Sequence, residues 1–160
     1  MSVTKPKVLL FSTIQTTFID SDFKLLNNFS DVKWICARGI IAVIKLNWGM
    51  LFRDIGVAWF ASVYSAFIVF FAKIFNKKSI IIVGGADVIK DPTLGYGLLL
   101  SNWKKIFVKY AIRNATHVLP TSDFLSIASI QVGQYKGGNI TVIYPGLHPS
   151  VWKQDRKSVV

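Results

Sequence analysis

Hydrophobic and polar positions along the first part of the chain predict strands alternating with helices. Residues 7–12 form a short run rich in leucine and β-branched residues and are expected to be a strand, and residues 32–37 are expected to form a second strand. Between them, residues 22–29 place apolar side chains at helical spacing. Residues 39–52 carry only one charge, Lys45, and are predicted to form a second helix.

The stretch from residue 55 to residue 72 carries no formal charge and allows two interpretations. Its length reaches the lower edge of a membrane-spanning helix. However, Ser62, Tyr64 and Ser65 interrupt the apolar run. The favoured interpretation is therefore a buried strand within residues 54–60 that leads into a helix at 62–75, because buried parallel strands appear as continuous apolar runs.

The rest of the chain continues the same alternation. It predicts strands at 78–83, 116–120 and 140–144, and helices at 98–114 and 122–131, the last with Ser122 as its N-cap. Alternating strands and helices imply an α/β fold: a Rossmann-like parallel sheet with helices on both faces and ligands at the carboxyl ends of the strands. We expect one domain over residues 1–150, with 151–160 as a linker or tail.

Composition and charge limit the classes of binding partner that the chain is expected to have. Hydrophobic residues make up 52% of the chain, and 19 Lys and Arg against 8 acidic residues give a net charge of +11, which favours anionic partners. Nucleic acid is not expected, because the aromatic residues fall at core spacing and no recognised binding motif is present. The apolar run near the start is too short for a signal peptide, so we expect a cytoplasmic protein.

Cysteine and histidine offer little chemistry. Cys36 is the only cysteine, and with His117 and His148 it gives no metal-ligand spacing, so neither a disulfide nor a metal site is predicted. His117 lies in a predicted buried strand and is interpreted as a core residue.

The loops at the predicted carboxyl edge carry the candidate site. In Gly84-Gly85-Ala86-Asp87, the glycines permit close approach of the backbone, and the carboxylate can accept a hydrogen bond from a ligand hydroxyl. The alternative is a tight turn in which Asp87 caps the next segment.

Basic residues near apolar and aromatic ones suggest contact with a membrane surface. Lys105, Lys109 and Arg113 recur at helical spacing on the face opposite Trp103 and Ile106, which also fits an ordinary solvated face. Basic residues around the 39–52 segment, with its aromatic side chains, suit an interfacial helix. The candidates for facing anionic lipid are Arg38, Lys45, Trp48, Arg53, Lys105 and Lys109.

The order of segments from about residue 7 to 152 resembles the acceptor half of family-4 glycosyltransferases, which have the GT-B fold. The more specific pieces are Arg113-Asn114-Ala115, followed by a strand and Ser122, and Ile143-Tyr144-Pro145-Gly146 after a strand. The resemblance implies the N-terminal, acceptor-side domain of a retaining enzyme, which uses a nucleotide sugar as co-substrate and needs no cofactor. A lipid-linked or membrane-embedded acceptor is one expectation.

Site residues follow from the resemblance and from the predicted loops. The acceptor-binding candidates are Asp87, Gly84, Gly85, Ser62 and Ser122, and the donor-side or hinge candidates are Ser12, Thr13, Tyr144, Pro145 and Gly146. No catalytic residue is assigned. Asp87 need not be a general base, because the resemblance implies that a phosphate oxygen of the leaving group takes the acceptor proton.

Three departures from the family pattern bear on function. The 12–17 loop lacks the glycines that approach the donor phosphates. Either His148 stands where the family has Asp, or the turn is offset relative to the family pattern. The family's donor-binding domain carries two Glu seven residues apart, whereas all eight acidic residues here are Asp. We therefore expect the C-terminal domain to be supplied from outside these residues, in cis or in trans, and the chain to be inactive alone.

Two other functions remain open from sequence. One is a non-catalytic binding module of the same fold, which the missing Glu and the missing glycines motivate. The other is a small membrane-spanning protein that crosses the bilayer at 55–72.

Overall fold

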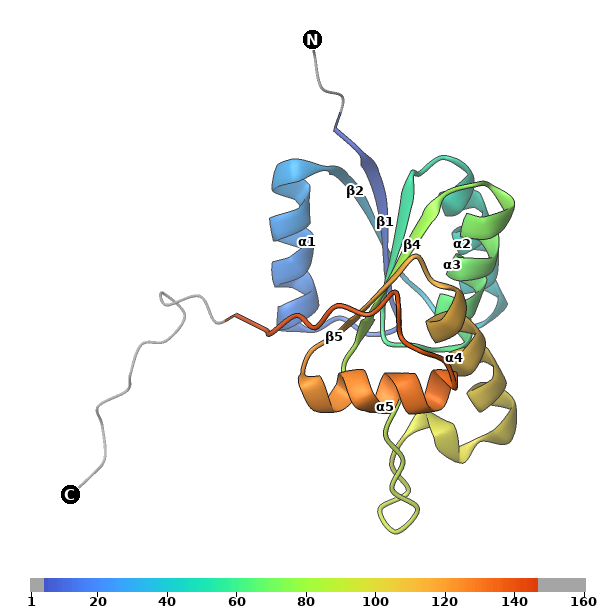
Figure 1. Cartoon of the computed structure of the whole chain (residues 1–160). Coiled ribbons are helices and arrows are strands. Elements are labelled where there is room, and N and C mark those ends of the chain that lie inside the picture. The colour runs from blue at the N-terminus through green and yellow to red at the C-terminus, as the bar shows by residue number, and fades with distance from the viewer. Residues whose placement is uncertain (1–4, 147–160) are drawn as a thin grey trace, which may run out of the picture.

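The computed structural model describes residues 5–146, which form one parallel sheet covered by helices (Figure 1). The strands are β1 (Lys7–Ser12), β2 (Asp31–Cys36), β3 (Ile55–Trp59), β4 (Lys78–Val83) and β5 (His117–Pro120). The helices are α1 (Thr17–Phe29), α2 (Gly39–Leu51), α3 (Val63–Ile74), α4 (Asn102–Asn114) and α5 (Asp123–Gly133), with a short 3₁₀ helix at Leu98–Leu100. The predicted α/β class is confirmed.

The strand order is β2-β1-β3-β4-β5, and every pair is parallel. The chain moves outward from β1 to β2, then returns to the other side of β1 and continues to β5. This reversal leaves a topological switch point between β1 and β3. In open parallel sheets, ligands bind in the crevice beyond the carboxyl ends of the strands at such a point.

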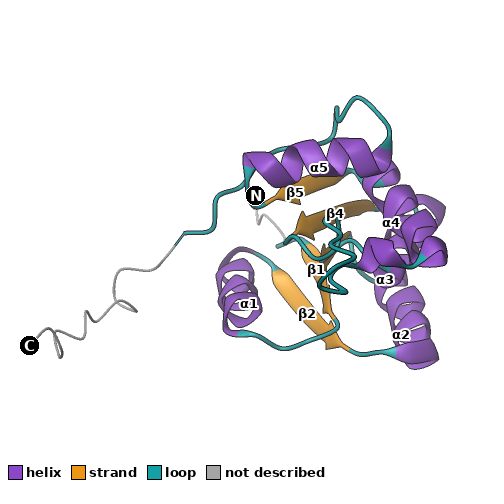
Figure 2. Ribbon diagram, turned by 90° about the horizontal axis from the view of Figure 1, so that it is seen from below, coloured by secondary structure: helices purple, strands orange, loops and turns teal. Residues whose placement is uncertain are grey.

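Helices lie on both faces of the sheet, as predicted. α1 covers one face, whereas α2, α3 and α4 cover the other, and α5 packs beside α4 near β5 (Figure 2). Because side chains alternate along a strand, β1 divides its residues between two cores. Leu9 and Phe11 join the core under α2 and α3, while Val8 and Leu10 join the core under α1.

The uncharged run at 55–72 is divided between two elements. Residues Ile55–Trp59 form β3, and Ser62 is the N-cap of α3. The Ser62 backbone N–H donates to Ser65 Oγ (2.6 Å), and the Ser65 N–H donates back to Ser62 Oγ (3.4 Å). In the described part of the chain, no helix has the length and hydropathy needed to cross a bilayer. The favoured interpretation of this run, a strand that leads into a helix, is therefore confirmed, and the alternative of a membrane span at 55–72 is wrong.

Two predicted helices begin differently. α1 starts at Thr17 rather than at residue 22, because Ile19 continues the apolar spacing of Phe23 by one turn and is fully buried. The predicted 98–114 helix is a 3₁₀ turn followed by α4. Gly97, at φ +106°, turns the backbone so close to the Ile89 carbonyl that only glycine fits there.

The predicted strand at 140–144 does not form. The segment runs beside β5, with the Thr141 N–H donating to the Val118 carbonyl (3.0 Å) and the Ile143 N–H to the Pro120 carbonyl (2.9 Å), but it makes only one bridge, Val118 with Ile140. Pro120 has no N–H with which to continue the ladder.

Other expectations are corrected or fall outside the structure. His117 is exposed rather than part of the core, because it begins the edge strand β5. The expected linker at 151–160, and His148, lie outside the described residues.

Candidate functional site

A cavity of about 830 Å³ opens at the carboxyl edge of the sheet. Its walls come from the ends of β1, β3 and β4 and from the first turns of α2, α3 and α4. The lining includes Thr13, Arg38, Gly39, Phe60, Ser62, Tyr64, Asp87, Trp103 and Lys104. The cavity therefore occupies the crevice that the topology predicts.

Several predicted site residues meet in this cavity, and others do not. Thr13, Ser62 and Asp87 line it together. Gly84 and Gly85 lie in the adjoining turn between β4 and Asp87 without lining the cavity. Ser122 lies outside it, where its Oγ accepts from the Leu125 N–H (3.3 Å) and caps α5.

Asp87 fastens two loops to each other. Its carboxyl group is fully buried, and its two oxygens accept from the Ala61 N–H (2.8 Å) and the Gly85 N–H (2.8 Å). Burial raises the pKa of Asp87 above the ordinary value for an aspartate, against the opposite effect of these hydrogen bonds. The structure thus shows the turn-capping arrangement, and contact with an acceptor hydroxyl stays a prediction.

Phe60 shapes the wall between β3 and α3. It holds a left-handed backbone at φ +72°, which is uncommon for an aromatic residue, while its N–H donates to the Ile82 carbonyl (2.9 Å). Its ring lies over Gly84, where a Cβ atom would stand 2.5 Å from Phe60 Cε1. Gly84 is therefore needed for this packing. Strained backbone of this kind gathers at ligand sites.

The cavity favours a negative ligand. Arg38 and Lys104 line it, and neither forms an ion pair with any residue of the described range 5–146. The Arg38 Nε donates to the Thr13 carbonyl (2.9 Å), which holds the guanidinium at the rim. The helix N-termini of α2, α3 and α4 also face this edge and add partial positive charge.

Tyr64 and Trp103 place aromatic groups at the same edge. The Tyr64 hydroxyl accepts from the Gly39 N–H (2.8 Å) at the start of α2. Trp103 is 55% exposed, and Lys104 Nζ lies 5.7 Å from the centre of its ring. Both rings line the cavity.

The donor-side candidates are dispersed. Ser12 is buried, and its Oγ accepts from Trp34 Nε1 (2.9 Å). The Tyr144 hydroxyl donates to Asp123 Oδ2 (2.7 Å), and this bond raises the pKa of Tyr144. Pro145 and Gly146 are exposed at the end of the described range, beyond the carboxyl end of β5.

The membrane-facing candidates also occupy different surroundings. Lys45 and Trp48 are exposed on α2, whereas Arg53 pairs with Asp31 (2.8 Å). Lys105 lines a hollow between α4 and α5, and Lys109 Nζ donates to Gln134 after α5. Arg38 belongs to the cavity, as described above.

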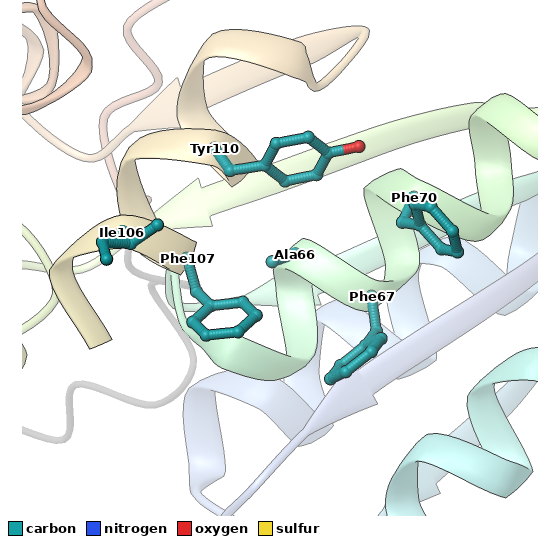
Figure 3. Close-up of a pocket in the computed structure, with 6 residues that line it drawn as sticks. All are labelled: Ala66, Phe67, Phe70, Ile106, Phe107 and Tyr110. Atoms are coloured by element: carbon teal, nitrogen blue, oxygen red, sulfur yellow. The ribbon is translucent and has the colours of Figure 1, made fainter. Parts of the chain in front are cut away.

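A second, narrower hollow runs between α3 and α4. It is a groove of about 300 Å³ lined by Ala66, Phe67 and Phe70 of α3 and by Ile106, Phe107 and Tyr110 of α4 (Figure 3). Ile106 is 68% exposed and Phe70 is 47% exposed, so the groove opens to the surface.

Sequence reasoning did not single out Lys104 or Phe60. Lys104 lies one helical turn before Phe107 and Val108, which places it on the α3 side of α4 and away from the Lys105 face. This spacing could have identified Lys104 from the sequence. The left-handed backbone of Phe60 could not have been predicted, because nothing in the local sequence requires it.

Comparisons with known proteins do not assign this chain to a family: a scan against protein-family models found no match, and a search of curated proteins found none either.

Proposed function

We propose that this chain is the acceptor-side half of a retaining glycosyltransferase, which moves a sugar from a nucleotide sugar to an acceptor. The observation that carries the proposal is the cavity at the carboxyl edge, built from the loops that the sequence motifs indicate. It offers the Ser62 hydroxyl and aromatic walls at Phe60 and Trp103, and Thr13, expected on the donor side, places a second hydroxyl at its wall. Such groups suit the polar rim and the apolar faces of a sugar-like acceptor.

Within this proposal, Asp87 is first a positioning residue. It accepts hydrogen bonds from the backbone N–H groups of Ala61 and Gly85, and so joins the loop after β3, which carries Phe60 and Ser62, to the turn after β4. Each carboxylate oxygen has a second lone pair, which leaves capacity for a ligand hydroxyl.

The donor half lies outside these residues. No Glu is present in the sequence, so the paired Glu that the family resemblance implies for nucleotide-sugar binding must come from another segment or another polypeptide. In this proposal the chain alone is inactive.

The protein works at the inner face of a membrane as a peripheral protein. α2 supports this step of the proposal, because it exposes Ile40, Ile41, Ile44 and Trp48 together with Lys45. An apolar face with basic residues suits insertion at the headgroup level of an anionic membrane.

A reconstitution experiment tests the proposed function. The genomic region around the coding sequence is searched for a segment or neighbouring gene that encodes two Glu seven residues apart, and that polypeptide is co-purified with this chain. Radiolabelled nucleotide sugars are then offered with a lipid extract. We expect label transfer only when both parts are present. If the second polypeptide transfers the label equally well without this chain, or if the pair transfers none, the proposal is wrong.

A further inference from the structure

We infer from the groove and the cavity together that the acceptor is a single-chain anionic amphiphile, with its apolar chain between α3 and α4 and its charged head at the carboxyl edge. This inference rests on the proposed function, whose acceptor it specifies.

The two hollows adjoin one another. Phe67 lines both, and Phe107 of the groove is followed on α4 by Val108 of the cavity. α3 and α4 both begin at the carboxyl edge and run back along the same face of the sheet (Figures 1 and 2). The groove therefore leads from the cavity toward the middle of both helices.

The groove suits a hydrocarbon chain. Within residues 5–146 its lining is apolar apart from the Tyr110 hydroxyl, and three phenyl rings and an isoleucine form its walls (Figure 3). From Val63 to Phe70, α3 advances by about 10 Å at the usual rise per residue. An extended hydrocarbon chain of about ten carbons would fill this length.

The cavity end suits a negative head. Arg38 and Lys104 line it without an ion pair in residues 5–146, and three helix N-termini point to the same edge. Among the described residues, Asp87 is the only carboxylate in the lining, and it is buried and accepts hydrogen bonds from two backbone N–H groups. The positive end and the apolar end are thus placed as an anionic amphiphile requires.

Dodecyl phosphate tests this inference as a probe for the full chain. It is titrated below its micelle concentration, with binding followed by isothermal calorimetry. Dodecyltrimethylammonium keeps the chain and reverses the charge, and inorganic phosphate keeps the anion without a chain. We expect dodecyl phosphate to bind at least tenfold more tightly than either control.

Two pairs of variants locate the site. Ile106→Glu places a charge in the groove at an exposed position, and its control, Ile127→Glu, changes a residue of similar exposure (58%) on α5. Lys104→Ala removes one of the two cations of the cavity, and its control, Lys78→Ala, removes an exposed cation at the start of β4, at the opposite edge of the sheet. We expect Ile106→Glu to weaken binding at least tenfold and Lys104→Ala threefold to tenfold, while each control changes it less than twofold. Circular dichroism and thermal unfolding confirm that every variant is folded.

Three results would overturn the inference: equal binding of dodecyl phosphate and the cationic probe, no binding, or equal effects of a variant and its control. A dimer that forms through the groove would also overturn it. Sedimentation equilibrium would show such a dimer, and Ile106→Glu would dissociate it. These outcomes are separate from failure of the proposed function. Sugar transfer to a water-soluble acceptor would support the proposed function and contradict the amphiphilic acceptor. Binding of dodecyl phosphate without any sugar transfer by the reconstituted pair would support the amphiphile site and contradict the proposed function.

Discussion

At the scale of single residues, the cavity depends on close backbone contacts that small changes disturb. Asp87 joins the loop after β4 to the loop after β3, and Gly84 leaves room for the Phe60 ring to pack against the same turn. Neither role requires a ligand, so both can be tested by stability measurements alone.

Replacing Asp87 tests how much its hydrogen bonds between the two loops stabilise the fold. Asp87→Asn sets an amide N–H₂ group against a backbone N–H, which should lower the free energy of unfolding by about 1–3 kcal/mol at neutral pH. Asp20→Asn, at an exposed pair with Lys24, should cost less than about 1 kcal/mol. Urea unfolding measures both.

The stability difference between wild type and Asp87→Asn should also depend on pH, and the direction of that dependence follows from the raised pKa of Asp87. Because the folded pKa of Asp87 is raised, the folded state binds the proton more tightly than the unfolded state does. The stabilisation that proton binding at Asp87 gives the folded state is fully present below about pH 4, the ordinary pKa of an aspartate. It is lost as the pH rises through the raised pKa. The difference in unfolding free energy between wild type and Asp87→Asn should therefore shrink as pH rises. A difference that grows with pH contradicts this.

Gly84→Ala tests the packing of Phe60. The added Cβ would lie 2.5 Å from the ring, so we expect destabilisation of about 1–3 kcal/mol from overpacking. Gly138→Ala, where nothing lies within 4 Å, serves as the control and should be nearly neutral. The cost of Gly84→Ala should fall in a Phe60→Ala background, as thermal unfolding of the four variants of the double-mutant cycle would show. An unchanged cost would show that the ring is not the obstacle.

At the scale of elements, strands and helix caps with a clear local sequence pattern could be predicted. Features that depend on how elements pack against one another could not. β1 and β4 have the predicted ends, because each is a compact apolar run bounded by polar residues or glycine. Ser62 and Ser122 were recognisable as N-caps because serine is favoured at that position. The first turn of α1 was missed because its one buried residue, Ile19, is adjacent to Phe18 and does not by itself establish helical spacing.

The failed prediction at 140–144 has a single-residue cause. Its β-branched pattern is that of a strand, but the neighbouring Pro120 cannot donate. Likewise, the exposure of His117 depends on β5 being at the edge of the sheet, which the local pattern does not encode.

Pro120→Val tests this explanation. The new N–H should bond to the Thr141 carbonyl and convert residues near 140–143 into a sixth strand. Amide hydrogen exchange should slow at Thr141 and Ile143, whose N–H groups already bond to β5. Leu119→Val, which leaves the number of donors unchanged, is the control. If exchange at these amides is as fast as in wild type, proline is not what ends the ladder.

At the scale of the whole molecule, exposed apolar side chains occur on both faces of the sheet, at Leu25 and Phe29 of α1 as well as on the helices of the other face. The α2–α4 face exposes large apolar side chains on three helices, including Ile44, Trp48, Phe70 and Ile106, and the cavity opens at its edge. The sequence placed the site at this edge through the order of elements. It could not place Arg38 in the cavity or Lys105 toward α5, because those positions depend on how helices pack.

Vesicle sedimentation tests the membrane proposal. Ile44→Glu should reduce binding to phosphatidylglycerol vesicles at least tenfold, since burial of one large apolar side chain is worth about 1.5–3 kcal/mol. Leu25→Glu, of similar exposure on α1, should leave binding unchanged. Equal binding of both variants would reject α2 as the contact, and equal binding of wild type to phosphatidylcholine vesicles would reject the role of charge.

The central claim is that the cavity holds the acceptor rather than the sugar nucleotide. Amide chemical-shift mapping on the ¹⁵N-labelled chain tests it most directly, with dodecyl phosphate and UDP-glucose titrated separately. The account predicts that dodecyl phosphate shifts the amides of Ser62, Phe67, Lys104 and Ile106, while UDP-glucose causes little change. Tight binding of UDP-glucose in the cavity, or dodecyl phosphate shifts confined to α1 and α5, would contradict it.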